Sequence, residues 1–300
     1  MGSIKLATTG KKPTKTVDTL VPDINKLLTG LANNKKLKIS DKQLDEFLKN
    51  IKDAIVDWSN PVKQNKSSLR MSIIGRPARQ LWYDKHRPEK QYTPDPSTQL
   101  KFLYGHILEH LILFLTELAG HTVTDQQKKV SVHGIVGHMD SKIDGEVVDV
   151  KTASPYAFKK FEQGTLNEDD PFGYIAQLSG YEASEKTNHG GFLAINKSTG
   201  QLAFFKPDDL MKPNVKTLIT ELKDKLEKEQ PPERCYEPVF HEKSGNKKLP
   251  AGCVFCSHKV ECHKDSNEGK GLRAFKYANG KVYLTHVEKE PKVDEVKVNE

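Results

Sequence analysis

Apolar residues recur every three to four positions in several stretches of the chain, and this spacing predicts amphipathic helices. The clearest stretch runs from Asp41 to Trp58, where Ser40 or Asp41 can cap the helix start and Asn60-Pro61 ends it. A second helix, from Gln99 to Ala119, is apolar on more than one side, so we expect it to be buried. Further helices are expected to begin near Pro77 and to cover 156–163, 172–186 and 208–229.

Alternating apolar and polar residues, with turn residues between them, predict strands in the intervening stretches. The expected strands lie within 121–132, on both sides of Asp144-Gly145 in 136–151, within 190–195 and 201–205, and on both sides of Asn279-Gly280 in 272–287. Asp-Gly and Asn-Gly are strong signals for two-residue hairpin turns. Helices and strands thus alternate along the chain, which indicates an α/β fold in which helices flank a central sheet.

The hairpin around Asp144-Gly145 carries the most informative polar residues. Period-two alternation puts His138 and Asp140 on one face of its first strand, and Asp149 and Lys151 on one face of its second. The turn brings the two aspartates close together, which is unfavourable unless a cation lies between them or one is protonated. Carboxylate oxygens are ligands that magnesium prefers, and Lys151 points to the same place. The alternative is a solvated hairpin with two surface acids and a lysine.

One acid stands out within the long buried helix. Glu109 lies among leucines and an isoleucine, and a buried acid needs a partner. It is either a third carboxylate for a cation or a glutamate at the helix edge that pairs with a lysine. His110 is the next candidate in this helix.

Two other helices carry polar pairs that could serve a nucleic acid. Arg76 and Arg79, near the helix start at Pro77, could meet phosphate, or they could be surface arginines on a core helix. Gln177 and Tyr181 are four residues apart, so they share a helix face. That face is either simple packing with a polar rim, or it holds DNA and orients Lys151.

Composition narrows the class of protein. The 300 residues carry a formal net charge of +7, which suits a polyanionic partner, although excess lysine also serves solubility. No apolar run approaches the length that spans a membrane, and the start of the chain lacks the apolar core of a signal peptide. We therefore expect a cytoplasmic protein, in the host cytoplasm if it is viral. The expected divisions are a basic flexible arm (1–40), a core (41–232), a cysteine-bearing module with a hairpin (233–287) and a disordered tail (288–300).

All four cysteines lie in the last third of the chain. Three of them form a Cys-x2-Cys-x5-Cys pattern, and a fourth precedes it; they are Cys235, Cys253, Cys256 and Cys262. In a chain without an export signal, this clustering favours a metal site over disulfides. His258 or His263 could supply a ligand if Cys235 is too distant.

Taken in order, these segments resemble one known group of enzymes. "RPARQLWY", "GHILE", "GHMD", "DGEVVDVKT", "QLSGY" and the cysteine cluster follow one another over roughly residues 68–265. This order is similar to that of the RecB-like, phage-type exonucleases of the PD-(D/E)XK superfamily. The resemblance implies a mixed central sheet of the restriction-endonuclease type and a small C-terminal cysteine–metal module.

The resemblance also implies a role for each candidate residue. Glu109, Asp140 and Asp149, with the main-chain carbonyl of Val150, would hold Mg²⁺ or Mn²⁺, although many relatives have His where this chain has Glu109. Lys151 would activate water or stabilise charge on the phosphate. Gln177 and Tyr181 match a Q-x-x-x-Y motif that orients the lysine and grips DNA.

The cysteines match this group only in part. Cys253, Cys256 and Cys262 resemble the C-terminal part of an iron–sulfur staple. The fourth cysteine of such staples precedes the catalytic core, at the place that Arg76 holds here, so Cys235 is expected to replace it. We expect a 4Fe–4S cluster, with Zn²⁺ as the alternative.

These features together predict a divalent-metal-dependent DNA exonuclease that acts on single strands or free ends. Its role would lie in DNA replication, recombination or degradation, alongside proteins of those processes. Two alternatives remain open at this stage. One is a structure-specific or single-strand endonuclease, and the other is a non-catalytic, metal-stapled nucleic-acid-binding protein.

Overall fold

A computed structural model describes residues 15–60, 69–87, 95–278 and 280–298. The chain divides into two compact units, and each unit is discontinuous in sequence. The first unit contains residues 1–62, 96–169 and 178–213, and the second contains residues 63–95, 170–177 and 214–300. No helix among the described residues is long and apolar enough to cross a membrane.

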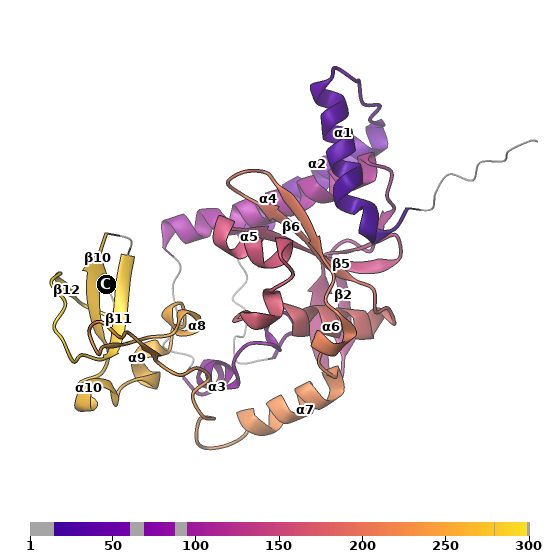
Figure 1. The fold of residues 1–300 in the computed structure, drawn as a ribbon. Coiled ribbons are helices and arrows are strands. Elements are labelled where there is room, and N and C mark those ends of the chain that lie inside the picture. Colours follow the sequence, from indigo (N-terminus) through magenta and orange to yellow (C-terminus); the bar gives the residue numbers. More distant parts are fainter. Residues whose placement is uncertain (1–14, 61–68, 88–94, 279, 299–300) are drawn as a thin grey trace, which may run out of the picture. The chain divides into compact units, whose positions relative to one another are not determined.

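A five-stranded sheet forms the centre of the first unit (Figure 1). Its strand order is β1-β4-β5-β6-β7. The strands are β1 (Val123–Thr124), β4 (Ser141–Ile143), β5 (Glu146–Ala153), β6 (Gly191–Asn196) and β7 (Leu202–Phe205). Strands β5 and β6 are parallel, and every other neighbouring pair is antiparallel. The predicted α/β class with a mixed central sheet is therefore confirmed.

Helices cover both faces of this sheet. On one face, Val148 and Val150 of β5 pack with Ile112 and Leu113 of α4 (Pro96–Leu118). On the other face lies α5 (Pro155–Glu162), where the ring of Phe161 is 5.7 Å from that of its neighbour in β6. Because side chains alternate along a strand, Asp149 and Lys151 share one face of β5, and Val148 and Val150 share the other.

The expected hairpin forms, but its first strand is divided. Strand β3 (Ile135–Met139) pairs with β2 (Lys128–Val132) in a separate two-stranded sheet, whereas β4 pairs with β5. The turn between β4 and β5 has positive φ at both Asp144 (51°) and Gly145 (92°), as a type I′ turn requires. Asp140 lies at the break between β3 and β4. The alternation of polar and apolar residues could not predict this break.

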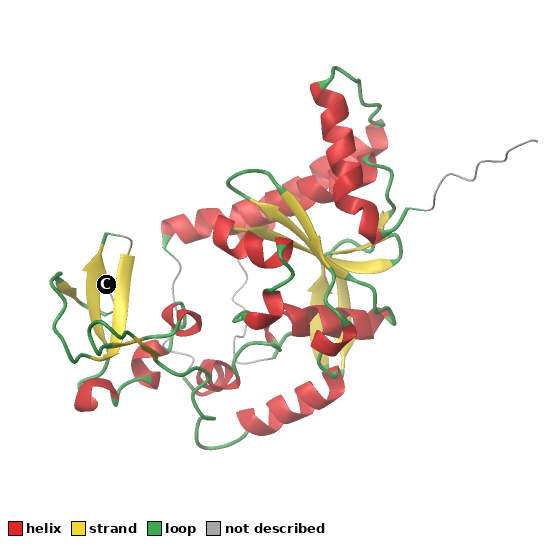
Figure 2. Cartoon of the chain, viewed as in Figure 1, coloured by secondary structure: helices red, strands yellow, loops and turns green. Residues whose placement is uncertain are grey.

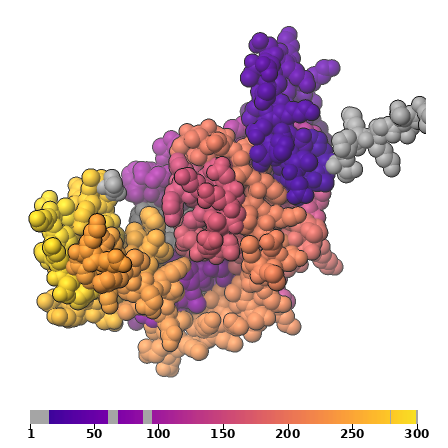
Figure 3. Space-filling model, viewed as in Figure 1, coloured from indigo at the N-terminus to yellow at the C-terminus, as the bar shows by residue number. Residues whose placement is uncertain are grey.

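The N-terminal segment is more ordered than its composition predicts. Residues 1–40 were expected to form a flexible arm. Residues 1–14 lie outside the described part of the chain. After them come a short 3₁₀ turn at Val17–Thr19 and the helix α1 (Leu20–Ala32). Val17, Leu20 and Ile24 are buried against α4 and the sheet. Their spacing of three and four residues makes a short apolar stripe that the surrounding polar residues obscure. Figure 3 shows the outer side of this helix, in indigo, exposed to solvent.

The predicted helix after Ser40 is confirmed. Helix α2 (Asp41–Ser59) begins with a capping box in which the Ser40 side chain and that of Gln43 each bond the other's backbone N–H. It packs along α4, where the rings of Phe47 and Phe114 stack with centroids 4.6 Å apart. The long helix expected at 99–119 is α4, which starts three residues earlier.

Two helices and a short turn form the core of the second unit. They are η2 (Met71–Ile73), α3 (Ala78–His86) and α7 (Val215–Leu226), which share one apolar cluster. The indole N–H of Trp82 in α3 donates to the Lys228 carbonyl at 2.8 Å. Helix α6 (Tyr174–Glu185) has its first turn in this unit, where both carboxylate oxygens of Asp170 accept N–H groups at 3.0 Å.

The C-terminal segment forms a second five-stranded sheet, part of which lies beside the label C in Figure 2, where all strands are yellow. Its order is β12-β10-β11-β9-β8. The strands are β8 (Val239–Phe240), β9 (Lys247–Lys248), β10 (Arg273–Tyr277), β11 (Gly280–His286) and β12 (Glu295–Val296). The predicted hairpin is the β10–β11 pair, and Asn279 itself lies outside the described residues. Short helices α8 (Ala251–Val254), α9 (Lys259–Cys262) and α10 (Ser266–Gly269) precede it.

The tail after residue 288 is not disordered as far as residue 298. Strand β12 pairs with β10, and Arg273 binds the carboxylates of Glu290 and Glu295. The buried side chain of Asn246 accepts the N–H groups of Glu288 and Lys289 at 2.8 and 2.9 Å. These long-range partners, which composition cannot reveal, hold a lysine- and glutamate-rich tail in place.

Candidate functional site

Strand β5 presents a buried acid and a lysine on one face. Asp149 is 1 % exposed, and one of its carboxylate oxygens forms a short ion pair with the Lys151 ammonium. Apart from this ion pair, neither oxygen of Asp149 has a hydrogen-bond partner among the described residues. Buried carboxylates normally accept several hydrogen bonds, so this one is under-satisfied and suited to a cation.

Asp140 lies beside the same part of β5. Strand β4 pairs with β5 only as far as Ser141 opposite Val148, and beyond that point Asp140 Oδ2 accepts the Val150 N–H at 2.8 Å. Burial and the charges of Glu109 and Asp149 hold the pKa of Asp140 well above its usual range, against the opposing effects of Lys151 and the Val150 N–H. The aspartate thus covers the edge of β5 where its neighbouring strand departs.

Glu109 on α4 is the third acid. Burial raises its pKa to about 7, and the charge of Asp149 adds to the rise, whereas a hydrogen bond from Gln127 and the charge of Lys151 lower it. The hydrogen bond runs from Gln127 Nε2 to Glu109 Oε1 at 2.6 Å. Glu109 is thus bound by a glutamine through one of its two carboxylate oxygens.

The three acids interact electrostatically, but their side chains are not arranged as a complete metal-binding site. Among the described residues, no three His, Cys, Asp or Glu side chains are arranged as a group ready to hold an ion. The chemistry of the donors nevertheless fits a hard divalent cation, because Asp149 has under-satisfied buried oxygens, and the pKa values of Glu109 and Asp140 are raised first by burial and then by the repulsion of neighbouring acids. A cation would relieve that repulsion.

Val150 contributes its backbone at this edge. In a strand, the N–H and C=O of one residue point toward the same neighbouring strand. The Val150 N–H is bonded by Asp140, so we expect the Val150 carbonyl to face the same side. That the Val150 carbonyl binds a metal ion, as the resemblance implies, stays a prediction.

Gln177 and Tyr181 lie one turn apart in α6, as predicted. Gln177 is 8 % exposed and Tyr181 is 1 % exposed. Such buried side chains suit an internal hydrogen-bonding or orienting role, whereas direct contact with DNA would require them to become exposed.

Of the two arginines near Pro77, Arg79 is engaged by other parts of the second unit, and a phosphate contact of Arg76 stays a prediction. Arg79 Nε donates to Cys262 Sγ at 3.1 Å, and its guanidinium also bonds the Pro232 carbonyl and lies 5.5 Å from the Tyr83 ring centre. The Nε of Arg76 is buried and has no hydrogen-bond partner among the described residues. The structure therefore assigns Arg79 to the cysteine region.

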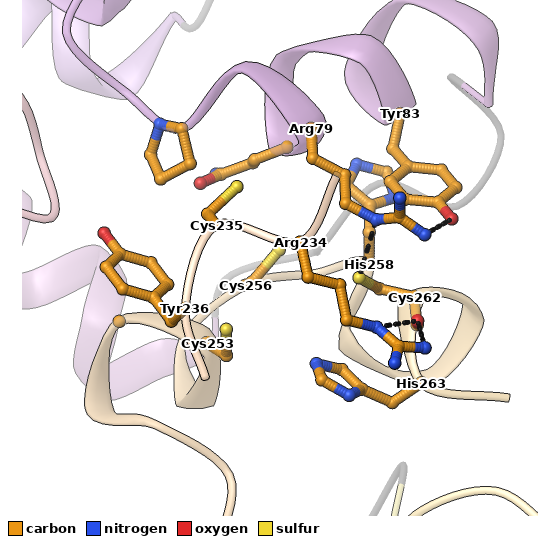
Figure 4. Close-up of a pocket in the computed structure, with 13 residues that line it drawn as sticks. Arg79, Tyr83, Arg234, Cys235, Tyr236, Cys253, Cys256, His258, Cys262 and His263 are labelled. Carbon is orange, nitrogen blue, oxygen red and sulfur yellow. Dashed lines mark hydrogen bonds between the residues drawn. The ribbon is translucent and has the colours of Figure 1, made fainter. Parts of the chain in front are cut away.

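One pocket in the second unit collects all four cysteines (Figure 4). Its volume is about 30 Å³, and its walls also include Arg79, Arg234 and the two histidines His258 and His263. The cysteines are all free thiols and all four line this pocket, but no three of the described His, Cys, Asp or Glu side chains there are arranged as a group ready to hold an ion. Segments 78–83, 234–236 and 252–263 thus meet at one point.

The pocket disfavours thiolates unless a cation is present. Burial, together with the mutual repulsion of the thiols, raises the pKa of Cys253 to about 12 and that of Cys256 to about 11. A metal ion or cluster binds thiolates and removes this penalty, so the donor set fits such a group. The Nδ1 atoms of His258 and His263 are buried without a hydrogen-bond partner among the described residues.

One of the two histidines, His258, already interacts with residues other than the cysteines, which affects whether it can serve as a metal ligand. His258 Nε2 lies 2.7 Å from Asp84 Oδ1, and the histidine ring stacks on Tyr83. Burial lowers the pKa of His263 to about 4, so His263 is neutral at physiological pH. The neutral imidazole is the form that binds metals, so His263 remains an alternative ligand beside the four thiols.

Two residues of these sites are absent from the sequence predictions. Gln127, in the loop between β1 and β2, contacts Glu109, and Arg234 donates to the Cys262 carbonyl at 2.8 Å. Neither residue belongs to a recurring motif. The adjacency of Arg234 to Cys235 is the one sequence signal that could have suggested a role for either of them.

Comparison with known proteins gives distant likenesses only. No protein-family model matches the chain, and no curated protein matches its sequence. The crystal structure of SSO0001 is 17 % identical and matches 73 % of this chain and 95 % of its own, with a TM-score of 0.38. An alkaline exonuclease, LHK-Exo from Laribacter hongkongensis, is 15 % identical over 57 % of this chain and 94 % of its own, with a TM-score of 0.36. The same exonuclease in complex with dAMP is 16 % identical over 54 % and 91 %, with a TM-score of 0.35.

Proposed function

We propose that this protein is a divalent-metal-dependent DNA nuclease of the PD-(D/E)XK type, related to the RecB-like phage exonucleases. The observation that carries the proposal is the under-satisfied, buried carboxylate of Asp149, paired with Lys151 and placed within electrostatic range of Asp140 and Glu109. Three acids and one lysine at the edge of a central strand are unfavourable for the fold alone. They are useful to an enzyme that must bind a cation beside a phosphate.

Each residue has a definite task in this proposal. Asp140, Asp149 and Glu109, with the Val150 carbonyl, would hold Mg²⁺ or Mn²⁺. The bound ion would polarise the phosphodiester, lower the pKa of a water molecule and neutralise the leaving oxygen. Without the ion, the Lys151 ammonium neutralises Asp149. With the ion on Asp149, Lys151 would be released to stabilise charge on the phosphate or to exchange a proton with the attacking water.

Gln177 and Tyr181 would act from within α6. Their burial supports a role in orienting the lysine-bearing region, and it does not favour direct grip on DNA. The net charge of +7 supplies sequence-independent attraction for the DNA backbone.

The cysteine pocket is proposed to hold a metal as a structural staple. Cys235, Cys253, Cys256 and Cys262 would bind a 4Fe–4S cluster, with Zn²⁺ as the alternative. The guanidinium groups of Arg79 and Arg234 border the pocket and would offset the negative charge of four thiolates. Such a metal would join the segments at 78–83, 234–236 and 252–263.

The substrate is proposed to be DNA with free ends or single-stranded character, processed during replication, recombination or degradation. The protein would work in the cytoplasm, or in the host cytoplasm if it is viral, alongside other proteins of these processes. Cleavage of end-labelled linear single-stranded DNA and of a closed single-stranded circle tests the proposal, with Mg²⁺, with Mn²⁺ and with EDTA. We expect the linear DNA to be degraded with either metal, to survive in EDTA, and the circle to remain closed.

Other results of this cleavage assay would change the proposal. A circle that is opened at a rate similar to that of linear cleavage would replace the exonuclease with an endonuclease. Cleavage that continues in EDTA would overturn the metal-dependent chemistry proposed for the three acids. Cleavage of neither substrate would overturn the nuclease proposal and favour a metal-stapled nucleic-acid-binding protein.

A further inference from the structure

Gln127 is bonded to two of the three acid-bearing segments at once. Its side-chain Nε2 donates to Glu109 Oε1 at 2.6 Å. Its main-chain N–H donates to the Asp140 carbonyl at 3.0 Å. One loop residue thus ties α4 to the point where β3 ends and β4 begins.

The backbone of Gln127 has an uncommon conformation that makes both bonds possible. Its φ is +54°, in the left-handed region that residues other than glycine, asparagine and aspartate seldom adopt. Asp125, two residues earlier, has the same φ. A strained conformation persists only where its surroundings enforce it, and such residues gather at functional sites. Here the enforcing partners are Glu109 and Asp140.

The other feature is the direction of the bond to Glu109. A glutamine amide donates a hydrogen bond without carrying a charge. It can therefore orient a carboxylate and leave the negative charge in place, whereas a lysine would neutralise that charge. It binds Oε1, and Oε2 is then the oxygen that Glu109 can offer to a cation. Residues that orient metal ligands in this way strongly affect metal affinity although they never touch the metal.

We propose that Gln127 is a positioning residue that aligns Glu109 and Asp140 for a divalent cation. This inference rests on the proposed metal-dependent nuclease function. Gln127 acts through Glu109 by its side chain and through Asp140 by its backbone, and it contacts neither the cation nor the DNA.

The test is Mn²⁺ binding to the full-length protein, measured by titration calorimetry, with a Gln127→Asn variant. Asparagine tolerates the left-handed conformation, so the main-chain bond to Asp140 is kept. Its side chain is one methylene shorter and does not reach Glu109. We expect Mn²⁺ affinity to fall about 10-fold. Gln127→Gly, which also accepts this φ, should give the same loss and guards against an effect peculiar to asparagine.

The neighbouring glutamine provides a matched control. The side chain of Gln126 is bonded elsewhere: its Oε1 accepts a hydrogen bond from Asn50 Nδ2 at 3.2 Å. Gln126→Asn should leave Mn²⁺ affinity unchanged. Thermal unfolding of each metal-free variant shows whether any loss comes from general destabilisation.

A double-mutant cycle separates positioning from a diffuse structural effect. If Gln127 acts through Glu109, then Gln127→Asn should weaken Mn²⁺ binding far less in a Glu109→Gln background than in the wild type. An equal loss in both backgrounds, or wild-type affinity in both Gln127 variants, would overturn the inference. In either case, if the wild-type protein binds Mn²⁺ and cleaves DNA, the proposed nuclease function stands and only the role of Gln127 is wrong. A wild-type protein that does neither overturns the proposed function together with this inference.

Discussion

At the scale of single residues, the site is a set of charges that the fold holds in an unfavourable arrangement. Asp149 is neutralised by Lys151, whereas Glu109 and Asp140 have raised pKa values because they are buried near each other and near Asp149. Raised pKa values favour protonation of these carboxyls, and a bound cation would favour their ionised forms. This makes proton release, metal binding and stability depend on one another.

The raised pKa of Glu109 predicts how stability varies with pH. The pKa is about 7 in the folded protein against 4.5 ordinarily, so the folded state binds more protons between these values. The free energy of unfolding of the metal-free wild type should therefore fall as pH rises through this window and level off above it. Glu109→Gln removes that contribution.

We expect Glu109→Gln to be roughly 2 kcal/mol more stable than the wild type at pH 8 and similar to it at pH 5, measured by urea unfolding in EDTA. An equal difference at both pH values would contradict the assigned shift.

Lys151 should matter for cleavage more than for metal binding. In Lys151→Met, the ammonium that competes with a cation for Asp149 is removed, so Mn²⁺ affinity should be kept or increased. Cleavage should fall by about 100-fold or more, because proton transfer or charge stabilisation at the phosphate is lost. The exposed Lys159 on α5 provides the control, and Lys159→Met should behave as the wild type in both assays. Loss of Mn²⁺ binding in Lys151→Met would instead indicate that the lysine is needed to build the site.

At the scale of helices and strands, periodicity and turn chemistry predict much of the architecture. The helices α2 and α4 and the type I′ turn at Asp144-Gly145 follow from capping residues, apolar spacing and an Asp-Gly pair. Contacts between distant segments are what the sequence could not supply. The burial of α1 depends on a short stripe within a polar stretch, and the ordered tail depends on Arg273 and Asn246.

The candidate sites show the same limit. Asp149, Lys151 and the four cysteines could be selected from spacing alone, because those residue types carry their chemistry in sequence. Gln127 could not, because its role depends on a left-handed backbone and on two partners 18 and 13 residues away in sequence. Arg79 was expected to bind phosphate, but the fold directs it to Cys262.

A close approach of two glycines gives a prediction about the start of α6. Gly173 has a φ of +71°, and a Cβ there would lie 2.1 Å from the main chain of Gly75. Gly173→Ala should therefore lower the free energy of unfolding by about 3 kcal/mol or more, because backbone strain and a clash with rigid main chain add together.

Gly200 offers a control with the same strain and no clash. Its φ is +76°, and a Cβ there would meet no atom within 4 Å. Gly200→Ala should cost about 1 kcal/mol, through strain alone. Equal losses in the two variants, measured by urea unfolding, would show that Gly75 and Gly173 are not held in contact.

At the scale of the whole molecule, the proposed chemistry divides between the two units. The acids lie in the first unit, and the cysteine pocket lies in the second, where it gathers three separate segments. A metal at the thiols would therefore act on stability, and a metal at the acids would act on catalysis.

Anaerobic purification followed by visible absorption and metal analysis tests the cysteine pocket. We expect broad visible absorption, with iron and acid-labile sulfide in equal amounts, and we expect removal of the metal to lower the unfolding temperature. A colourless protein with bound zinc would show that the pocket binds Zn²⁺ and not a 4Fe–4S cluster. A protein with neither metal, equally stable before and after chelation, would contradict the staple.

The central claim is that Asp149 and its neighbours bind a cation that drives hydrolysis of DNA. The most direct test is the rate of cleavage of end-labelled single-stranded DNA in Mg²⁺ by the wild type and by Asp149→Asn, which preserves the shape of the side chain. We expect cleavage by the wild type and a loss of at least about 100-fold in the variant, with the fold retained by circular dichroism. Cleavage by Asp149→Asn at the wild-type rate would contradict the claim.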